Sequence, residues 1–176
     1  MFATLVACAD PPRIAMVDST LVRAHRAAAG GKRGVQSQAI GRSRGGRTTR
    51  IHAVADEQGR IAAVLLTPGQ ASDISGARAL LPTMPPLEDP IADKAYDTDD
   101  LRAFLTRQGT RPVISPMPNR RAIPAFDPVA YRKRNLIERA FYRLKDWRAI
   151  ATRYDKTARN FLAGICLVLA VTSWIS

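Results

Sequence analysis

Residues 131–145 constrain the fold more than any other stretch, and their sequence is YRKRNLIERAFYRLK. No glycine or proline interrupts them, and apolar residues recur at the spacing of an α-helix. At about 100° per residue, apolar side chains fall on one side and a polar row falls on the other. The pattern therefore predicts one helix that buries its apolar side. The apolar side comprises Leu136, Ile137, Ala140, Leu144 and Trp147, and the polar row comprises Tyr131, Arg134, Glu138 and Lys145.

The polar row of this helix has two interpretations. It is a solvated face whose ion pairs contribute about 0.2–0.5 kcal/mol each, or it is part of a functional site. A carboxylate flanked by cations on a basic helix is an unusual arrangement, but the helix alone does not decide between the two.

Two short apolar runs elsewhere end in an aspartate. RIAMVDST at 13–20 contains Asp18, and PIADK at 90–94 contains Asp93. A carboxylate in a buried strand is costly unless it is paired or binds a metal, although a turn cap would explain either one alone. Two such cases in a chain that alternates strands and helices suggest a shared site.

The remaining pattern predicts an α/β fold. Strands are expected at 50–55, 61–67 and 111–115, and helices at 73–81 and 100–108, followed by an apolar C-terminal helix at 161–174. Ser72 or Asp73 is predicted to cap the helix at 73–81. His25 and His52 have no partner at ligand spacing, which favours structural roles.

The stretch 24–50 is rich in glycine and arginine and contains no acidic residue. Its glycines predict an irregular loop, which would be disordered without DNA and ordered on it. A loop of this composition can follow a phosphate backbone closely, so Arg42, Arg44 and Arg47 are candidate DNA-binding residues. The net charge of +12 favours a polyanionic partner, with nucleic acid preferred over a membrane surface.

Composition excludes several other classes of protein. Cys8 and Cys166 are the only cysteines and lack metal-ligand spacing, which argues against a thiolate site and a disulfide framework. Residues 1–12 carry no recognisable chemistry and lack the features of a signal peptide. The apolar run at 161–175 is shorter than the roughly 20 residues that a membrane span needs, so a cytoplasmic protein is expected.

The spacing of the polar row is similar to the Y-R-E-K signature of DDE transposases from bacterial insertion sequences. The resemblance covers nearly the whole chain from Met16 onward. It extends to the motifs MVDSTLVRAHR, GRSRGGRTTRIHAVADEQGR, PGQASD, IADKAYD and ATRYDKTARNF. Four residues at fixed spacing, with two further acidic motifs in the right order, make a specific signal.

The resemblance implies a ribonuclease-H-like catalytic domain at 13–176, with a mixed five-stranded sheet flanked by helices. It implies that Asp18, Asp93 and Glu138 form the catalytic triad and hold two Mg²⁺ ions, for which Mn²⁺ can substitute. Tyr131, Arg134 and Lys145 would grip DNA phosphates near the cut. The implied activity is cleavage of double-stranded DNA at insertion-sequence ends and strand transfer into target DNA, by a homodimer bound to DNA in the bacterial cytoplasm.

One departure from the family keeps alternatives open. Family members typically carry a DNA-binding region before the first aspartate, whereas 17 residues precede Asp18 here. A catalytic-frame or truncated form is therefore expected. The alternatives are an inactive DNA-binding remnant that regulates the full-length transposase, and a nuclease that cleaves without joining.

Overall fold

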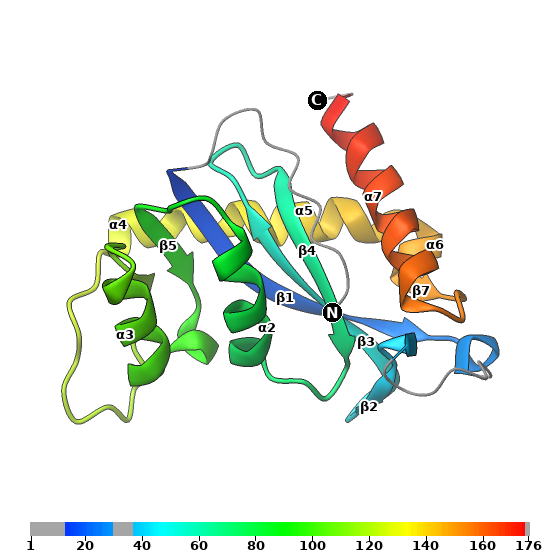
Figure 1. Ribbon diagram of the computed structural model, residues 1–176, viewed down its shortest axis with the longest axis horizontal. Coiled ribbons are helices and arrows are strands. Elements are labelled where there is room, and N and C mark those ends of the chain that lie inside the picture. The colour runs from blue at the N-terminus through cyan, green and yellow to red at the C-terminus, as the bar shows by residue number, and fades with distance from the viewer. Residues whose placement is uncertain (1–12, 30–36, 175–176) are drawn as a thin grey trace.

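The computed structural model describes residues 13–29 and 37–174, which form one mixed sheet with helices on both faces (Figure 1). The predicted leader at 1–12, residues 30–36 of the predicted basic loop and the end of the apolar run at 175 lie outside the described residues. The sheet of the described part contains β1 (Ile14–Ala24), β2 (Gly41–Ser43), β3 (Gly46–Ala55), β4 (Ile61–Pro68), β5 (Asp89–Ala92), β6 (Val113–Ile114) and β7 (Thr152–Arg153).

The centre of the sheet has the strand order β4-β3-β1-β5-β6. β3 pairs antiparallel with β1 and β4, whereas β5 pairs parallel with β1 and β6. Three strands joined by hairpins and two further parallel strands fit a ribonuclease-H-like fold. The predicted count of five strands is wrong, because the sheet also contains β2 and β7. These have three and two residues, which is too short to show a periodic pattern.

β1 and β3 both extend into the stretch that was predicted to be an irregular loop. β1 continues to Ala24, and β2 and β3 form a hairpin in which Arg42 pairs with Arg47. Gly46 closes the hairpin with a φ of +94°, a conformation that glycine adopts without strain. The loop prediction is therefore wrong for residues 41–50, because these glycines build a turn between strands.

Alternating side chains of β1 contribute to two apolar cores, one on each face of the sheet. Met16 packs into the core under α5 (Asn135–Lys145) and α7 (Ala158–Trp174). Val17 packs into the core under α2 (Asp73–Leu80) and α3 (Asp99–Arg107), on the opposite face. The two-residue period of a strand thus assigns Asp18 to the face that α5 covers.

The helix predicted at 131–145 is one helical run built from three pieces. α4 (Pro128–Tyr131) leads into a 3₁₀ turn, η4 (Arg132–Arg134), and then into α5. Asp127 caps the run by accepting hydrogen bonds from the amides of Val129 and Ala130, at 2.9 and 3.0 Å. The prediction of one regular α-helix is therefore wrong. The run starts earlier, at Pro128, and the helix narrows to a 3₁₀ turn at the three consecutive cations of η4.

The apolar side of this run also differs from the prediction at two positions. Ile137, Ala140 and Leu144 are buried as predicted. Trp147 remains 43% exposed, because α5 ends at Lys145 and α6 (Arg148–Ala151) starts in a new direction. Phe141, which was not assigned to the core, is buried in its place.

α7 packs across the same core as α5. Phe161, Ile165 and Val168 are buried, whereas Leu167 is 69% exposed and Val171 is 41% exposed. Among the described residues, no helix has the length and apolarity needed to cross a membrane.

α2 is held closely against β3 by a glycine and a histidine. Ser72 caps α2 by accepting a hydrogen bond from the Ser75 amide at 3.1 Å. His52 is buried and hydrogen-bonded to Thr67 at 2.8 Å, and burial lowers its pKa to about 4. A Cβ added at Gly76 would lie 2.0 Å from Nδ1 of His52, so only glycine allows this approach.

Gly76→Ala is therefore expected to destabilise the protein by about 1–3 kcal/mol, because the neutral ring of His52 must move within a packed core. Urea unfolding of the variant measures the loss. Gly109→Ala makes no close contact but has a φ of +76°, so it reports backbone strain without overpacking. Equal stability of Gly76→Ala and the parent would contradict the tight contact.

Candidate active site

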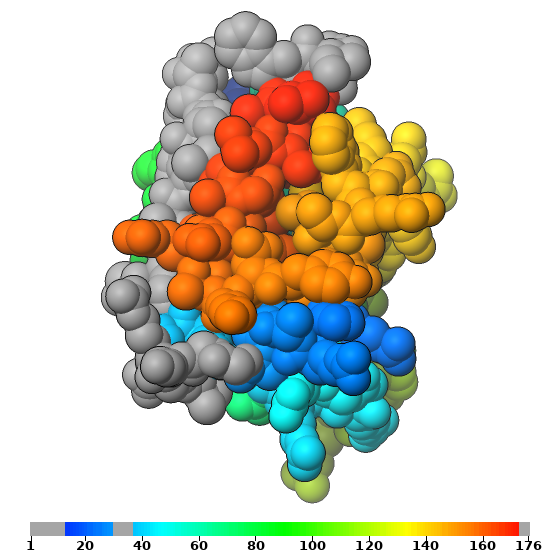
Figure 2. Space-filling model, turned by 90° about the vertical axis from the view of Figure 1, so that its right-hand side faces the viewer, coloured from blue at the N-terminus to red at the C-terminus, as the bar shows by residue number. Residues whose placement is uncertain are grey.

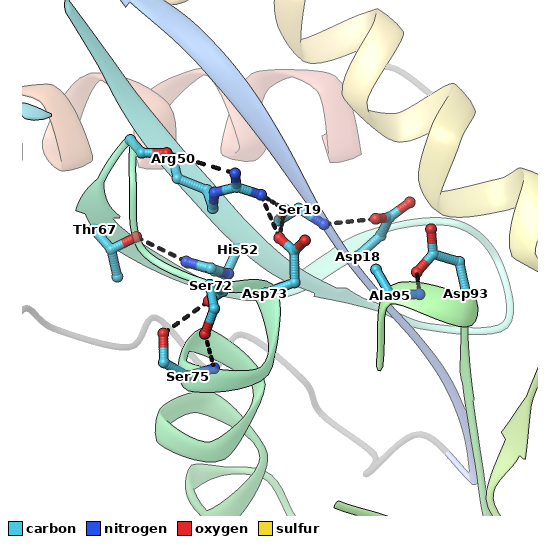
Figure 3. Close-up of polar contacts among 11 residues, drawn as sticks. Asp18, Ser19, Arg50, His52, Thr67, Ser72, Asp73, Ser75, Asp93 and Ala95 are labelled. Atoms are coloured by element: carbon cyan, nitrogen blue, oxygen red, sulfur yellow. Dashed lines mark hydrogen bonds and ion pairs between the residues drawn. The ribbon is translucent and has the colours of Figure 1, made fainter. Parts of the chain in front are cut away.

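Asp18 and Asp93 lie on neighbouring parallel strands. The register pairs Val17 of β1 with Ala92 of β5, so the two aspartates follow directly at the carboxyl end of that ladder. Asp93 caps η3 (Lys94–Tyr96) by accepting a hydrogen bond from the Ala95 amide at 2.8 Å. Figure 3 shows both carboxylates on the same side of the strand ends. The sheet therefore brings together two residues that are far apart in sequence.

Glu138 is joined to Asp18 through Arg134. The guanidinium of Arg134 donates to Oδ2 of Asp18 at 2.7 Å and also bonds Glu138 one turn further along the helical run. The side chains of Asp18 and Arg134 are only 17% and 19% exposed. The polar row is therefore only partly solvated, because Arg134 packs against β1 while Glu138 remains 45% exposed.

Tyr131 and Lys145 occupy the two ends of the row. The Arg134 guanidinium lies 5.9 Å from the centre of the Tyr131 ring, and Tyr131 also meets Phe126 edge to face. Lys145 donates from Nζ to Oγ1 of Thr20 at 2.5 Å, and burial lowers its pKa below the ordinary value of 10.5. Arg134 and Lys145 thus bond residues of β1, and Tyr131 lies beside Arg134 at one end of the row.

An open pocket of about 230 Å³ lies between β1 and α5. Two carboxylates and one ammonium group line it, with Asp18 contributed by β1 and Glu138 and Lys145 by α5. Its lining residues are Asp18, Ser19, Thr20, Glu138, Phe141, Tyr142 and Lys145.

The electrostatics of Asp18 reflect this crowding. The pKa of Asp18 is raised to about 6, mainly by burial, and the nearby carboxylates of Asp93 and Asp73 contribute to the rise. The Ser19 amide and Arg134 oppose the rise. Burial lowers the pKa of Arg134, but Asp18, Tyr131, Glu138 and Asp93 outweigh it, so the pKa is raised overall. Arg134 therefore acts as the counter-ion of an acidic cluster formed by Asp18, Glu138 and Asp93.

Sequence reasoning missed a second polar network, on the opposite face of β1. The sequence predicts Ser72 or Asp73 as the cap of α2; Ser72 caps it, and Asp73 instead forms an ion pair with Arg50 and accepts a hydrogen bond from the Ser19 hydroxyl (Figure 3). The Ser19 amide in turn donates to Asp18 at 2.7 Å. The network therefore supports the strand segment that presents Asp18. Asp73 ends the motif PGQASD of the family resemblance, and that motif was the available signal.

Tyr96 completes the surroundings of these acids. Tyr96 is 1% exposed, and among the described residues its hydroxyl makes no hydrogen bond of normal geometry. Burial raises its pKa, and the charges of Asp18, Asp73 and Asp93 add to the rise. Ser19 lies near enough to the hydroxyl to lower this pKa slightly. Tyr96 is therefore a neutral, buried phenol beside the acidic cluster.

The three carboxylates are not arranged as a preformed metal site. Within the described ranges, no group of three or more His, Cys, Asp or Glu side chains could hold a metal ion. Carboxylate oxygens are the donors that Mg²⁺ prefers, and Arg134 already gathers Asp18 and Glu138 around one positive charge. The residues fit divalent cations chemically, provided that Arg134 moves away from the carboxylates.

Arg42, Arg44 and Arg47 lie apart from this cluster. They belong to the exposed β2–β3 hairpin. Arg47 precedes Ala53, the β3 partner of Asp18, by six residues, or roughly 20 Å at about 3.3 Å per residue. The structure therefore separates these cations from the acids.

Comparisons with known proteins show the family of the chain. The family model described as "Transposase DDE domain" matches residues 9–172. A curated protein of Brucella ovis, named "Putative transposase for insertion sequence element IS6501", is 37% identical over 125 residues, which cover 70% of this chain and 96% of that protein. No solved structure matches the chain. A family match over most of the chain, together with a relative of this similarity, places the protein among the DDE transposases of insertion sequences.

Proposed function

We propose that this transposase uses Asp18, Asp93 and Glu138 to cleave DNA at insertion-sequence ends and to join the freed end to target DNA. The observation that carries the proposal is the convergence of the three acids around β1. Asp93 neighbours Asp18 at the strand ends, and Arg134 bridges Asp18 to Glu138. A structural row of surface ion pairs would not need acids from three separate elements.

The three carboxylates would hold divalent ions, with Mg²⁺ the expected species and Mn²⁺ a substitute. Two such ions activate an attacking water or hydroxyl and stabilise the leaving oxygen. Arg134 would then exchange its carboxylate partners for a DNA phosphate, which it can bind with two parallel hydrogen bonds. Lys145, at the other end of the pocket, would act as a point charge on a second phosphate. Tyr131, stacked near Arg134, would orient that guanidinium.

A nicking assay tests the proposal directly. The purified chain is incubated with duplex DNA that carries the ends of its own insertion sequence, with Mg²⁺ or with EDTA. Nicks that require Mg²⁺ support cleavage, and products joined to target DNA support strand transfer. Nicks without joined products would reduce the function to that of a nuclease. Binding without nicks would indicate the non-catalytic regulator.

The regulator has one observation in its favour. Arg134 bonds carboxylate oxygens of both Asp18 and Glu138. Divalent ions would need the same oxygens. If Arg134 never leaves, the chain binds DNA without cutting it. Isothermal titration with Mn²⁺ separates the cases, because the parent binds Mn²⁺ only if Arg134 can leave the carboxylates, whereas Arg134→Gln should bind it in either case.

Lys145→Gln is expected to weaken DNA binding and to lower the slope of log K against log salt by about one unit, because one phosphate contact is lost. Binding titrations at several salt concentrations measure the slope. Arg107→Gln, on α3 and away from the pocket, serves as the charge-matched control. An unchanged slope for Lys145→Gln would exclude a phosphate contact by this residue.

The homodimer on paired DNA ends stays a prediction of the resemblance. Mass photometry of the protein with and without end DNA tests it, because pairing doubles the mass of the complex.

A further inference from the structure

An exposed pair of aromatic rings lies at the far end of β1. The rings of His25 and Tyr154 stack with their centres 4.5 Å apart and their planes 30° from parallel. Tyr154 is 57% exposed. Tyrosine normally buries a large apolar ring when it can. A ring that is supported on one face and open to solvent suggests a surface for stacking.

The backbone around the pair is well ordered by hydrogen bonds. β1 pairs parallel with β7, where Ala24 lies opposite Arg153. The His25 amide donates to the Arg153 carbonyl at 2.8 Å, and the Ala27 amide donates to Nδ1 of His25 at 3.3 Å. The His25 ring and the backbone next to Tyr154 are therefore held in place before any ligand binds, which lowers the entropic cost of binding.

A buried arginine anchors the strand that presents Tyr154. Arg153 is 0% exposed and donates to Oγ1 of Thr49 at 2.6 Å and to the carbonyl of Asp155 at 3.0 Å. Its guanidinium also lies 5.0 Å from the centre of the Phe161 ring. Burial lowers the pKa of Arg153 to about 10. Burying a cation is costly. Holding β7 through Arg153 therefore lowers the free energy of unfolding relative to a neutral anchor.

The surroundings of the pair are cationic. Figure 2 shows 3₁₀ turn η1 (Arg26–Ala29, blue) beside the segment that follows β7 (orange), with the β2–β3 hairpin (cyan) next to it. Arg23 of β1 pairs with Thr48 of β3, which connects the pair to that hairpin. The exposed cations of these segments are Arg23, Arg26, Arg42, Arg44, Arg47 and Lys156.

We propose that the His25–Tyr154 pair is a stacking platform for an unpaired base of the bound DNA, with the surrounding cations holding the adjacent phosphates. Aromatic side chains bind bases of any sequence by stacking, and each stacked base contributes substantially to affinity. His25 lies seven residues beyond Asp18, or roughly 23 Å along β1. At about 3.4 Å per nucleotide, the platform meets a base about seven nucleotides from the scissile phosphate. The inference rests on the proposed function, because it assumes that DNA follows β1.

Binding of 2-aminopurine DNA tests the platform, because this base loses fluorescence when it stacks. One probe is a duplex with a short single-stranded extension that carries 2-aminopurine, and the other is the same sequence fully paired. Tyr154→Ala is expected to weaken binding of the extended probe by about tenfold and to remove most of the quenching. Affinity for the paired probe should change by less than about twofold.

Two further variants serve as controls. Tyr154→Phe keeps the ring and should restore both affinity and quenching, which separates stacking from hydrogen bonding. Leu167→Ala truncates another exposed apolar side chain, on α7, and should behave as the parent. Thermal unfolding of each variant shows whether the fold persists.

The outcomes separate the platform from the proposed function. If Tyr154→Ala binds and quenches the extended probe as the parent does, the platform is refuted. If the parent binds and nicks paired DNA but shows no quenching of the extended probe, the platform is refuted and the transposase function stands. If the parent binds neither probe, the course of DNA along β1 is refuted, and the proposed function fails with it.

Discussion

Asp18→Asn is expected to reduce Mg²⁺-dependent nicking by at least about a thousandfold, because the loss of a metal-holding carboxylate removes several kcal/mol of transition-state stabilisation. Affinity for DNA should stay within a few fold of the parent. Single-turnover nicking and a binding titration measure the two quantities. Asp93→Asn and Glu138→Gln should lose nicking in the same way, since each is one of the three carboxylates proposed to hold the ions.

The matched control for these variants is Glu88→Gln. Glu88 forms an exposed ion pair with Arg13 at the opposite end of β5 from Asp93, so its loss should change neither nicking nor binding. Asp18→Asn should also leave the fold intact, because a neutral amide replaces a partly buried charge. Normal nicking by all three triad variants would refute the catalytic assignment.

Asp97→Ala is expected to lower the free energy of unfolding by about 3–5 kcal/mol, because it leaves two arginines without their buried partner. The carboxylate of Asp97 is 0% exposed and accepts from Arg102 at 2.6 Å, from Arg120 at 2.7 Å and from the Met117 amide at 2.7 Å. These contacts tie the segment after β6 to the start of α3. Urea unfolding measures the loss. Asp99→Ala is the control, since Asp99 shares Arg120 but is 89% exposed, and its effect should stay under about 1 kcal/mol.

The effect of Asp97 should also depend on pH. Burial raises the pKa of Asp97, but hydrogen bonds from Arg120, the Met117 amide and Arg102 lower it below the ordinary value of 3.8 overall. A carboxyl whose folded-state pKa is depressed stabilises the fold at pH values above its unfolded pKa, and this contribution is lost as the pH falls through the folded-state value. The stability difference between the parent and Asp97→Ala should therefore be full at neutral pH and shrink below about pH 4. A difference that grows toward acid would contradict the assignment.

Local sequence patterns predicted much of the fold. Alternation and apolar runs located the five central strands, and both strand-end aspartates are adjacent because parallel strands with a shared register end together. The predicted ends of the strands were less accurate where pairing with a distant strand decides how far a strand extends. β1 reaches Ala24 because β3 and β7 pair with its last residues, and no local signal reveals those partners.

The partners of the polar row were the largest gap in the sequence reasoning. Helical spacing placed Arg134 and Glu138 on one face, but it could not show that Arg134 bonds Asp18, which is 116 residues away in the chain. The same limit hid the ion pair between Arg50 and Asp73 and the stacking of His25 on Tyr154. Each of these contacts depends on how the sheet brings distant segments together.

The bonds of Arg134 have a consequence for the order of assembly. Asp18 and Glu138 carry two negative charges in the pocket, and Arg134 and Lys145 balance them, so that of the three proposed triad acids only Asp93 has no cation of this row to offset it. An approaching polyanion should then meet little repulsion, and we expect that docking of the double helix does not have to wait for inorganic cofactors. Chelation would thus stop the reaction while leaving the nucleoprotein complex assembled.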